Sequence, residues 1–179
     1  MNYFLPLLYL TVILCVLSIL TLFIFKQIID KQKIESELYE LQKKIRSKTA
    51  NEFDYYSLGV IYLSKKLFDQ AIIHFSYALK NWDKNDTTGL ANLYNTVGFT
   101  YFESGQYDLS IYYYKQAINK SPEYTVALNN LAYSYEKKKL IPEAIETYKE
   151  VLNYDTTNST AMERIEYLSK RFKNRDDRI

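Results

Sequence analysis

One spacing of small and aromatic residues recurs three times in the chain and constrains its fold more than any other feature. In each copy a small residue precedes a tyrosine by three positions, and a second small residue follows that tyrosine by nine. An aromatic residue follows four positions later, and the second and third copies are offset by 34 residues. A repeat of this period predicts helical units that cannot bury their apolar faces alone and therefore stack. The residues at these sites, which we expect to pack between helices, are Gly59, Tyr62, Ala71, Phe75 and Ala78, then Gly98, Tyr101, Ser110, Tyr114, Ala117 and Pro122, then Ala132, Tyr135, Ala144, Tyr148 and Val151.

The pattern resembles the tetratricopeptide repeat, a helix-turn-helix unit. The resemblance implies an all-α fold, a right-handed solenoid of three repeats with a capping helix. We expect the repeats at 52–158 (about 52–85, 91–124 and 125–158), the cap at 159–172 and a charged tail at 173–179. Gly59 would sit mid-helix because the paired helix approaches closely there, with Tyr62 and Phe75 filling the remaining space.

Local signals predict where several helices begin and end. Gly105 can adopt the left-handed conformation that ends a helix. Ser121, Pro122 and Glu123 read as the N-cap, first-turn proline and first-turn acid of the third repeat. Five extra residues between the first two copies are expected in a longer loop at 81–89. For the capping helix, Thr160 and Glu163 suggest a capping box, and the inner face is expected to carry Met162, Ile165, Leu168 and Phe172.

The N-terminal segment, residues 1–25, contains 23 consecutive uncharged residues from Tyr3 to Phe25. As a helix it would measure roughly 35 Å, enough to cross a hydrocarbon core of about 30 Å. The basic n-region and small-residue cleavage site of a signal peptide are missing, and the run is too long for an amphipathic core helix. We therefore expect a retained transmembrane anchor. Basic residues gather only on its C-terminal side, so the positive-inside rule places the body in the cytoplasm or the equivalent stroma.

Residues 26–51 are expected to form a helical connector. Ile34, Leu38, Leu41 and Ile45 follow spacings of four, three and four, which gives one apolar stripe. We favour a stalk whose stripe packs on the first repeat. The alternative is a short dimeric coiled coil, and hence a weak homodimer, although only about two of the usual three or four heptads are present.

No residues are arranged for catalysis, cofactor binding or metal binding. His74 is the single histidine and Cys15 the single cysteine, and neither has a partner at metal-ligand spacing. We interpret His74 as a solvated or half-packed helix position. The net charge of +2 gives no reason to expect nucleic acid. The chain is therefore predicted to be a binding protein rather than an enzyme.

In this repeat family the first helix of each repeat lines a concave groove. By register, the exposed groove positions are Phe53, Tyr56, Val60 and Leu63, then Asn92, Asn95, Phe99 and Phe102, then Val126, Asn129, Tyr133 and Glu136. Asn95 and Asn129, 34 residues apart, are expected to form a ladder that holds a partner backbone. Chaperone-binding relatives carry a basic clamp for a C-terminal carboxylate. The matching positions here are Tyr56, Val60, Thr96, Val126 and Asn130, so capture of a chaperone tail is not expected.

The whole architecture (anchor, connector, three repeats and cap) resembles a family of small plastid-encoded and cyanobacterial tetratricopeptide proteins implicated in photosystem I assembly. The abundance of Lys, Ile, Asn and Tyr also suggests an A/T-rich coding genome, as in plastids. The resemblance implies a single-pass thylakoid protein whose repeats face the stroma and bind photosystem I subunits or assembly intermediates. Two alternatives remain open: a membrane-tethered adaptor or receptor unrelated to photosynthesis, and a regulatory subunit of an enzyme complex.

Overall fold

The computed structural model describes the backbone of residues 4–176, and within them every regular element is an α-helix. The all-α fold class is therefore confirmed. The side chains of Leu5, Pro6 and 172–176 are not among those described, so the predicted packing of Phe172 and the side chains of the charged tail at 173–179 lie outside the described part. The chain divides into two compact units, and the boundary in the sequence falls between Thr49 and Ala50.

The first unit is dominated by one helix, α1 (Phe4–Arg46). It runs without a break through the predicted anchor and most of the predicted connector. Its stretch Leu7–Arg46 is long and apolar enough to cross a membrane, with a mean hydropathy of 2.8 in its most apolar 18-residue window, none of which is buried. By length and composition α1 is thus a candidate membrane span. An N-terminal signal sequence meets the same criteria of length and composition.

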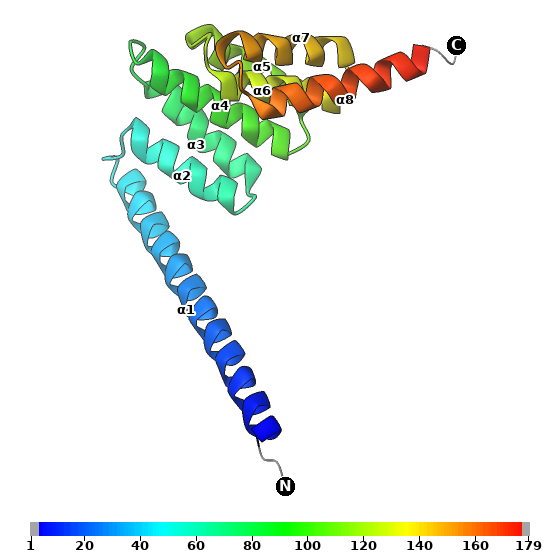
Figure 1. The fold of residues 1–179 in the computed structure, drawn as a ribbon. Helices are drawn as coiled ribbons and strands as arrows, with labels where there is room; N and C mark the ends of the chain where they lie inside the picture. Colours follow the sequence, from blue (N-terminus) through cyan, green and yellow to red (C-terminus); the bar gives the residue numbers. More distant parts are fainter. Residues whose placement is uncertain (1–3, 177–179) are drawn as a thin grey trace. The chain divides into compact units, whose positions relative to one another are not determined.

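The second unit contains seven described helices that stack in chain order (Figure 1). The helices pair as α2 with α3, α4 with α5, and α6 with α7, and α8 packs on α7. The first helices of successive pairs lie side by side, since the Phe102 and Tyr133 ring centroids of α4 and α6 are 5.2 Å apart. The helices are α2 (Glu52–Ser64), α3 (Phe68–Asn81), α4 (Thr87–Glu103), α5 (Tyr107–Lys120), α6 (Thr125–Lys137), α7 (Ile141–Tyr154) and α8 (Ser159–Asp176).

The turn inside each pair ends its first helix with a left-handed residue. Gly105 has φ +79°, as expected, and Lys66 and Lys139 occupy the same place in the other two repeats with φ of 58° and 62°. The next amide reaches back to the carbonyl of the repeat tyrosine, as in Gln106 N to Tyr101 O at 2.9 Å. This bond satisfies carbonyls at the helix end, and it recurs in all three repeats.

The two mid-helix glycines are explained by rings on the partner helices. A Cβ atom added to Gly59 would lie 2.5 Å from Cε1 of Phe75, and one added to Gly98 would lie 2.8 Å from Cδ1 of Tyr114. The ring itself therefore covers the glycine, while Tyr62 instead stacks on His74 with centroids 5.2 Å apart. The predicted packing residues are buried, apart from the three repeat tyrosines, Tyr62, Tyr101 and Tyr135, which are half-buried, and Pro122, which is exposed.

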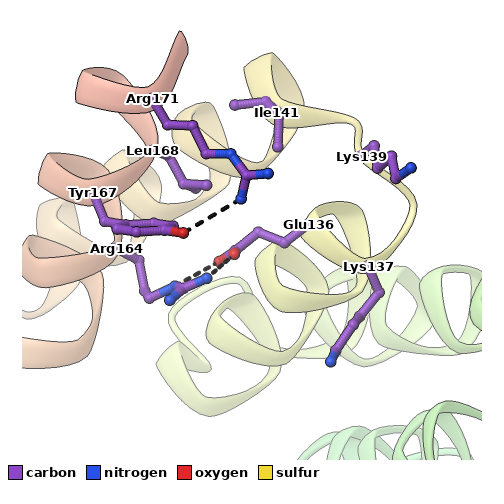
Figure 2. Close-up of a pocket in the computed structure, with 8 residues that line it drawn as sticks. All are labelled: Glu136, Lys137, Lys139, Ile141, Arg164, Tyr167, Leu168 and Arg171. Carbon is purple, nitrogen blue, oxygen red and sulfur yellow. Dashed lines mark hydrogen bonds and ion pairs between the residues drawn. The ribbon is translucent and has the colours of Figure 1, made fainter. Parts of the chain in front are cut away.

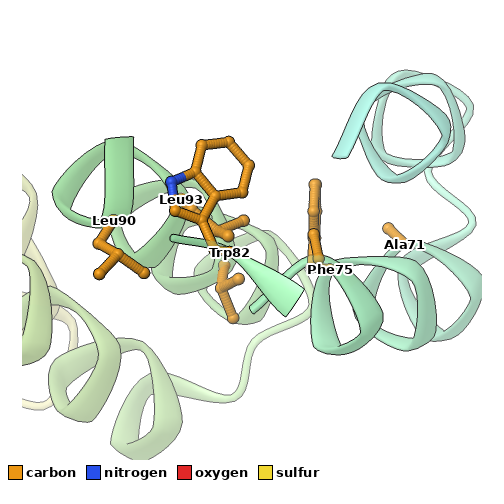
Figure 3. Packing of buried hydrophobic residues seen from close by; sticks show 7 residues of the cluster. Ala71, Phe75, Trp82, Leu90 and Leu93 are labelled. Carbon is orange, nitrogen blue, oxygen red and sulfur yellow. The ribbon is translucent and has the colours of Figure 1, made fainter. Parts of the chain in front are cut away.

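The insertion between the first two repeats mainly lengthens a helix, not a loop as predicted. Helix α4 has 17 residues, whereas α2 and α6 have 13 each. Asp86 makes this possible, because its Oδ1 accepts the Gly89 amide at 2.8 Å while its Oδ2 accepts the Trp82 indole N–H at 3.0 Å. Trp82 is then buried beside Leu90 and Leu93 in the first hydrophobic cluster (Figure 3).

Two predicted helix starts are wrong. Ser121 is the C-cap of α5 rather than the N-cap of the next helix, and α6 begins only at Thr125, so Pro122 lies in a turn. The turn is closed by the Tyr124 amide, which donates to the Ser121 carbonyl at 3.1 Å. At α8 the cap is Asn158, whose Oδ1 accepts the Ala161 amide at 3.1 Å, and not Thr160. At Ser121 an inter-repeat turn lies where the sequence suggested the start of a helix, whereas Thr160 already lies inside the first turn of α8.

Candidate partner-binding groove

The first helices of the repeats present an aromatic and aliphatic surface. Of the predicted groove residues, Phe53, Val60, Asn92, Phe99, Val126 and Tyr133 are exposed, while Tyr56, Leu63, Asn95, Phe102, Asn129 and Glu136 are half-buried. Phe53 is 55% exposed, Phe99 41% and Tyr133 40%. Isolated exposed apolar residues are ordinary, but a contiguous set typically marks an interaction site. We therefore treat this set as the candidate groove.

A hollow at the α2–α4 end of the groove gathers several of these side chains. Phe53, Tyr56 and Asn92 line it together with Trp82, Thr96 and Tyr124. The Phe53 and Trp82 ring centroids are 4.8 Å apart, and burial raises the pKa of Tyr124. Trp82 and Tyr124 were not predicted as groove residues, because they lie at the C-cap of α3 and the N-cap of α6, where register on the first helices gives no information. The signal available was that Trp82 is the single tryptophan and directly follows the second helix of the first repeat.

A second aromatic group lies between α4 and α6. Phe102 contacts both Tyr133 and Tyr107, with ring centroids 5.2 and 5.4 Å apart. The ammonium of Lys137 lies 4.9 Å from the centre of the Tyr133 ring, and interaction with the Tyr133 side chain raises the pKa of Lys137. The groove therefore carries a cation beside its aromatic floor at this end.

The asparagines that were predicted to form a ladder for a partner instead form hydrogen bonds within the solenoid. Asn95 does not pair with Asn129; its Oδ1 accepts from Asn130 at 3.0 Å, and its Nδ2 donates to the Tyr124 hydroxyl at 3.5 Å. Asn129 donates to Asn158 at 3.5 Å. In both repeats an asparagine thus donates a hydrogen bond to a residue in the turn that precedes the next helix pair or the capping helix. The amides fix one repeat against its neighbour, which leaves each with less capacity for a partner backbone than the sequence suggested.

Three of the five clamp positions also form hydrogen bonds within the chain. The Tyr56 hydroxyl lies 3.4 Å from Thr96 Oγ1, and Asn130 is bound to Asn95. The remaining two positions are the apolar residues Val60 and Val126. The sequence prediction that this groove does not hold a chaperone carboxylate stays a prediction, and these contacts agree with it.

His74 lies away from the groove on α3, between two tyrosines. Its ring stacks on Tyr62 at 5.2 Å and on Tyr55 at 6.3 Å between centroids, and its Nδ1 is buried without a hydrogen-bond partner. Among the described residues, no three His, Cys, Asp or Glu side chains form a group able to hold a metal ion. The position is that of a packed aromatic rather than a ligand.

The stability of the repeats is expected to fall as the pH falls below about 6.5 because of His74. Burial lowers its pKa from the ordinary value of about 6.5. Below that value the unfolded chain takes up a proton that the folded chain resists, so this contribution is complete above pH 6.5 and is lost as the pH falls through the folded pKa. Urea unfolding of the full chain in detergent, followed by Trp82 fluorescence, measures the change. His74→Phe keeps the stack and should flatten the pH dependence, whereas an imidazole NMR titration at or above 6.5 would contradict the prediction.

Comparison with known proteins identifies the repeats. Two family models, both described as tetratricopeptide repeat, match residues 53–123 and 101–164. Among solved structures, the crystal structure of MamA superposes with a TM-score of 0.72 at 21% identity, covering 82% of each chain. That identity shows the fold alone, and it agrees with the helical solenoid described above.

Two relatives extend the similarity to the whole chain. The protein ycf37 of Guillardia theta is 45% identical over 179 residues, which is the full length of both chains. The tetratricopeptide repeat domain-containing protein PYG7, chloroplastic, of Arabidopsis thaliana is 32% identical over 165 residues. This second alignment covers 92% of the present chain and 54% of PYG7, so the chain spans about half of that relative.

Proposed function

Because this chain belongs to the ycf37 family of tetratricopeptide-repeat proteins, we propose that it is a membrane-anchored scaffold for the assembly or stability of photosystem I. Solenoids of this kind are interaction scaffolds with extended concave binding surfaces. The chloroplastic relative PYG7 supports a plastid setting. The photosystem partner rests on the resemblance of the architecture to plastid and cyanobacterial assembly proteins.

The observation that carries the proposal is the exposed aromatic floor of the groove. Phe53, Phe99 and Tyr133 keep 40% or more of their surface in contact with solvent although each belongs to a helix that packs on its neighbours. Burying an aromatic side chain of this kind contributes about 1.5–3 kcal/mol. A few aromatic anchors typically supply most of the energy of a protein interface. The groove is therefore suited to an extended or helical segment with apolar side chains.

Helix α1 gives the groove its proposed location. A span across the thylakoid membrane would confine the groove to the membrane plane and raise its effective concentration toward membrane-embedded partners. The basic residues Lys26, Lys31 and Lys33 follow the apolar window and favour the stromal side for the repeats. We propose that the groove holds a stroma-exposed segment of a photosystem I subunit or assembly intermediate.

The combined substitution Phe99→Glu and Tyr133→Glu tests the groove. Both residues are exposed, so the repeats should stay folded while two carboxylates replace the apolar contacts. We expect at least a tenfold loss of photosystem I subunits co-purifying with the tagged full-length chain from solubilised membranes, and lower photosystem I accumulation. Blotting of the eluate and the low-temperature fluorescence of the cells measure the two effects.

The matched control is Tyr112→Glu with Tyr154→Glu. These tyrosines are 54% and 49% exposed and lie on α5 and α7, the second helices of their pairs. The control introduces the same charges outside the groove and should leave co-purification intact. If the groove variant retains its partners while circular dichroism shows folded repeats, the groove is not the binding site. If wild-type chain retains no photosystem I subunit, the partner assignment is wrong.

A further inference from the structure

A hollow lined by four cations lies where α6 ends, α7 begins and α8 passes (Figure 2). The cations are Lys137, Lys139, Arg164 and Arg171. Apolar surface from Ile141, Tyr167 and Leu168 forms its wall, and Glu136 is the acidic residue among the described residues that line it. The hollow adjoins the groove, because Lys137 lines it and also places its ammonium over the Tyr133 ring. The exposed rings of the aromatic floor, Phe53, Phe99 and Tyr133, are not among its lining residues.

Glu136 does not neutralise the other cations of the hollow, because its negative charge is already balanced by Arg164. One carboxylate oxygen accepts from the Tyr148 hydroxyl at 2.8 Å and from Arg164 Nε at 2.9 Å, and the other oxygen pairs with Arg164 Nη2. The Glu136 side chain is only 7% exposed. The positive charges of Lys139 and Arg171 therefore remain in excess at the rim, while the Lys137 ammonium lies over Tyr133.

The two arginines are held so that spare N–H groups remain. A guanidinium has five N–H donors, and Glu136 takes two from Arg164. The guanidinium carbon of Arg164 lies 5.1 Å from the centre of the Tyr167 ring, and Arg171 Nη1 donates to the Tyr167 hydroxyl at 3.3 Å. Tyr167 thus orients both forks before any ligand arrives, which lowers the entropy lost on binding. Guanidinium groups with free donors match carboxylates.

We propose that this hollow binds an acidic peptide segment, with carboxylates on the cationic rim and an apolar side chain against Ile141 and Tyr167. A peptide fits better than a lipid surface or RNA for two reasons. The cations surround a recess with an apolar wall rather than forming a broad flat patch. The whole chain has a net charge of only +2, which provides little long-range attraction for a polyanion. The hollow would give the scaffold a second contact, specific for acidic sequences, beside the groove.

Fluorescence anisotropy with the full-length chain in non-ionic detergent tests the proposal. The probe is a labelled peptide, Gly-Asp-Glu-Leu-Asp-Glu-Gly, and its neutral counterpart carries Asn and Gln in place of Asp and Glu. Lys139→Gln with Arg171→Gln removes two exposed cations without touching the Glu136–Arg164 pair. We expect this variant to bind the acidic peptide about tenfold more weakly, as the loss of two exposed ion pairs predicts. The neutral peptide should bind the wild-type chain about tenfold more weakly as well.

The matched control is Lys80→Gln with Lys149→Gln, which removes the same charge from exposed positions on α3 and α7. It should bind within about twofold of wild type. Equal losses in the two variants, or equal affinity for both peptides, would overturn the proposal. So would displacement of the probe by decauridylate RNA or soluble dihexanoyl phosphatidylglycerol at lower concentrations than by unlabelled acidic peptide. The readout involves no photosystem component, so it stands or falls independently of the proposed function.

Discussion

Replacing Gly59 with alanine is expected to lower the free energy of unfolding of the first repeat by about 2 kcal/mol. Alanine is the better helix former by about 1 kcal/mol, so a local argument predicts the opposite sign. The added Cβ would lie 2.5 Å from Cε1 and 2.6 Å from Cδ1 of Phe75, whose side chain is fully buried. Overpacking of a core typically costs about 1–3 kcal/mol, and two ring contacts this short call for the upper end or beyond.

Trp82 measures the effect directly, because this single tryptophan is buried in the same cluster as Phe75. Urea unfolding of the full-length chain in detergent gives the midpoint. Ser76→Ala, at an exposed position of α3, should change the stability by less than about 0.5 kcal/mol. Gly59→Ala combined with Phe75→Leu should cost less than the sum of the two single changes, since the smaller side chain relieves the contact. A neutral or stabilising Gly59→Ala would show that the ring moves aside freely.

Replacing Glu136 with alanine is expected to destabilise the docking of α8 by about 2–3 kcal/mol. The carboxylate accepts from the Tyr148 hydroxyl and pairs with Arg164, so it ties α6 to both α7 and α8. Burial, reinforced by Glu136, raises the pKa of Tyr148, as expected for a phenol that must stay protonated. A buried hydroxyl left without an acceptor costs about 1–3 kcal/mol. The Arg164 pair adds less, because 34% of that side chain remains exposed.

Glu136→Gln is the control, because its amide oxygen still accepts from Tyr148 while the charge is lost. It should cost about half as much as the alanine variant. Hydrogen exchange should show faster exchange in α8 and little change in α2 and α3, which lie at the other end of the stack. Tyr148→Phe in the Glu136→Ala background should add little, since the hydroxyl already lacks its partner. Additive effects of the two substitutions would argue against the hydrogen bond as the source of stability.

The sequence predicted the helical scaffold well, because the residue spacings that indicate it are local and occur three times. The small residues Gly59, Gly98 and Ala132 and the ring sixteen positions after each of them follow from helical register within the repeat. Gly105 in a left-handed turn was likewise predictable from its chemistry. The same local rules failed at Ser121, which lies in an inter-repeat turn, and at Thr160, where Asn158 two residues earlier caps the helix. The residue types that favour N-caps also favour turns and first helical turns, so composition alone does not distinguish these positions.

The candidate sites could be predicted only in part from the sequence. Helical register placed Phe99 and Tyr133 on the exposed groove face, but it could not show that Asn95 is bound to Asn130. It also could not place Trp82 in the groove hollow. The cationic hollow combines the end of α6 and the following turn with residues of α8. Its Glu136 and Arg164 are 28 residues apart in the chain. Such contacts depend on how one repeat is rotated against the next.

By itself, therefore, the sequence determined the repeat unit, the helical class and an apolar N-terminal helix long enough to span a membrane. These properties depend on spacing, propensity and length within a single element. Only the tertiary structure decided which polar groups are already satisfied and which cations remain in excess. Asn95 lost its predicted role because its neighbour in the stack uses the amide, and Arg171 gained one because Glu136 is already paired with Arg164. Partner selection is set by what packing leaves unsatisfied, and packing joins residues that the sequence keeps far apart.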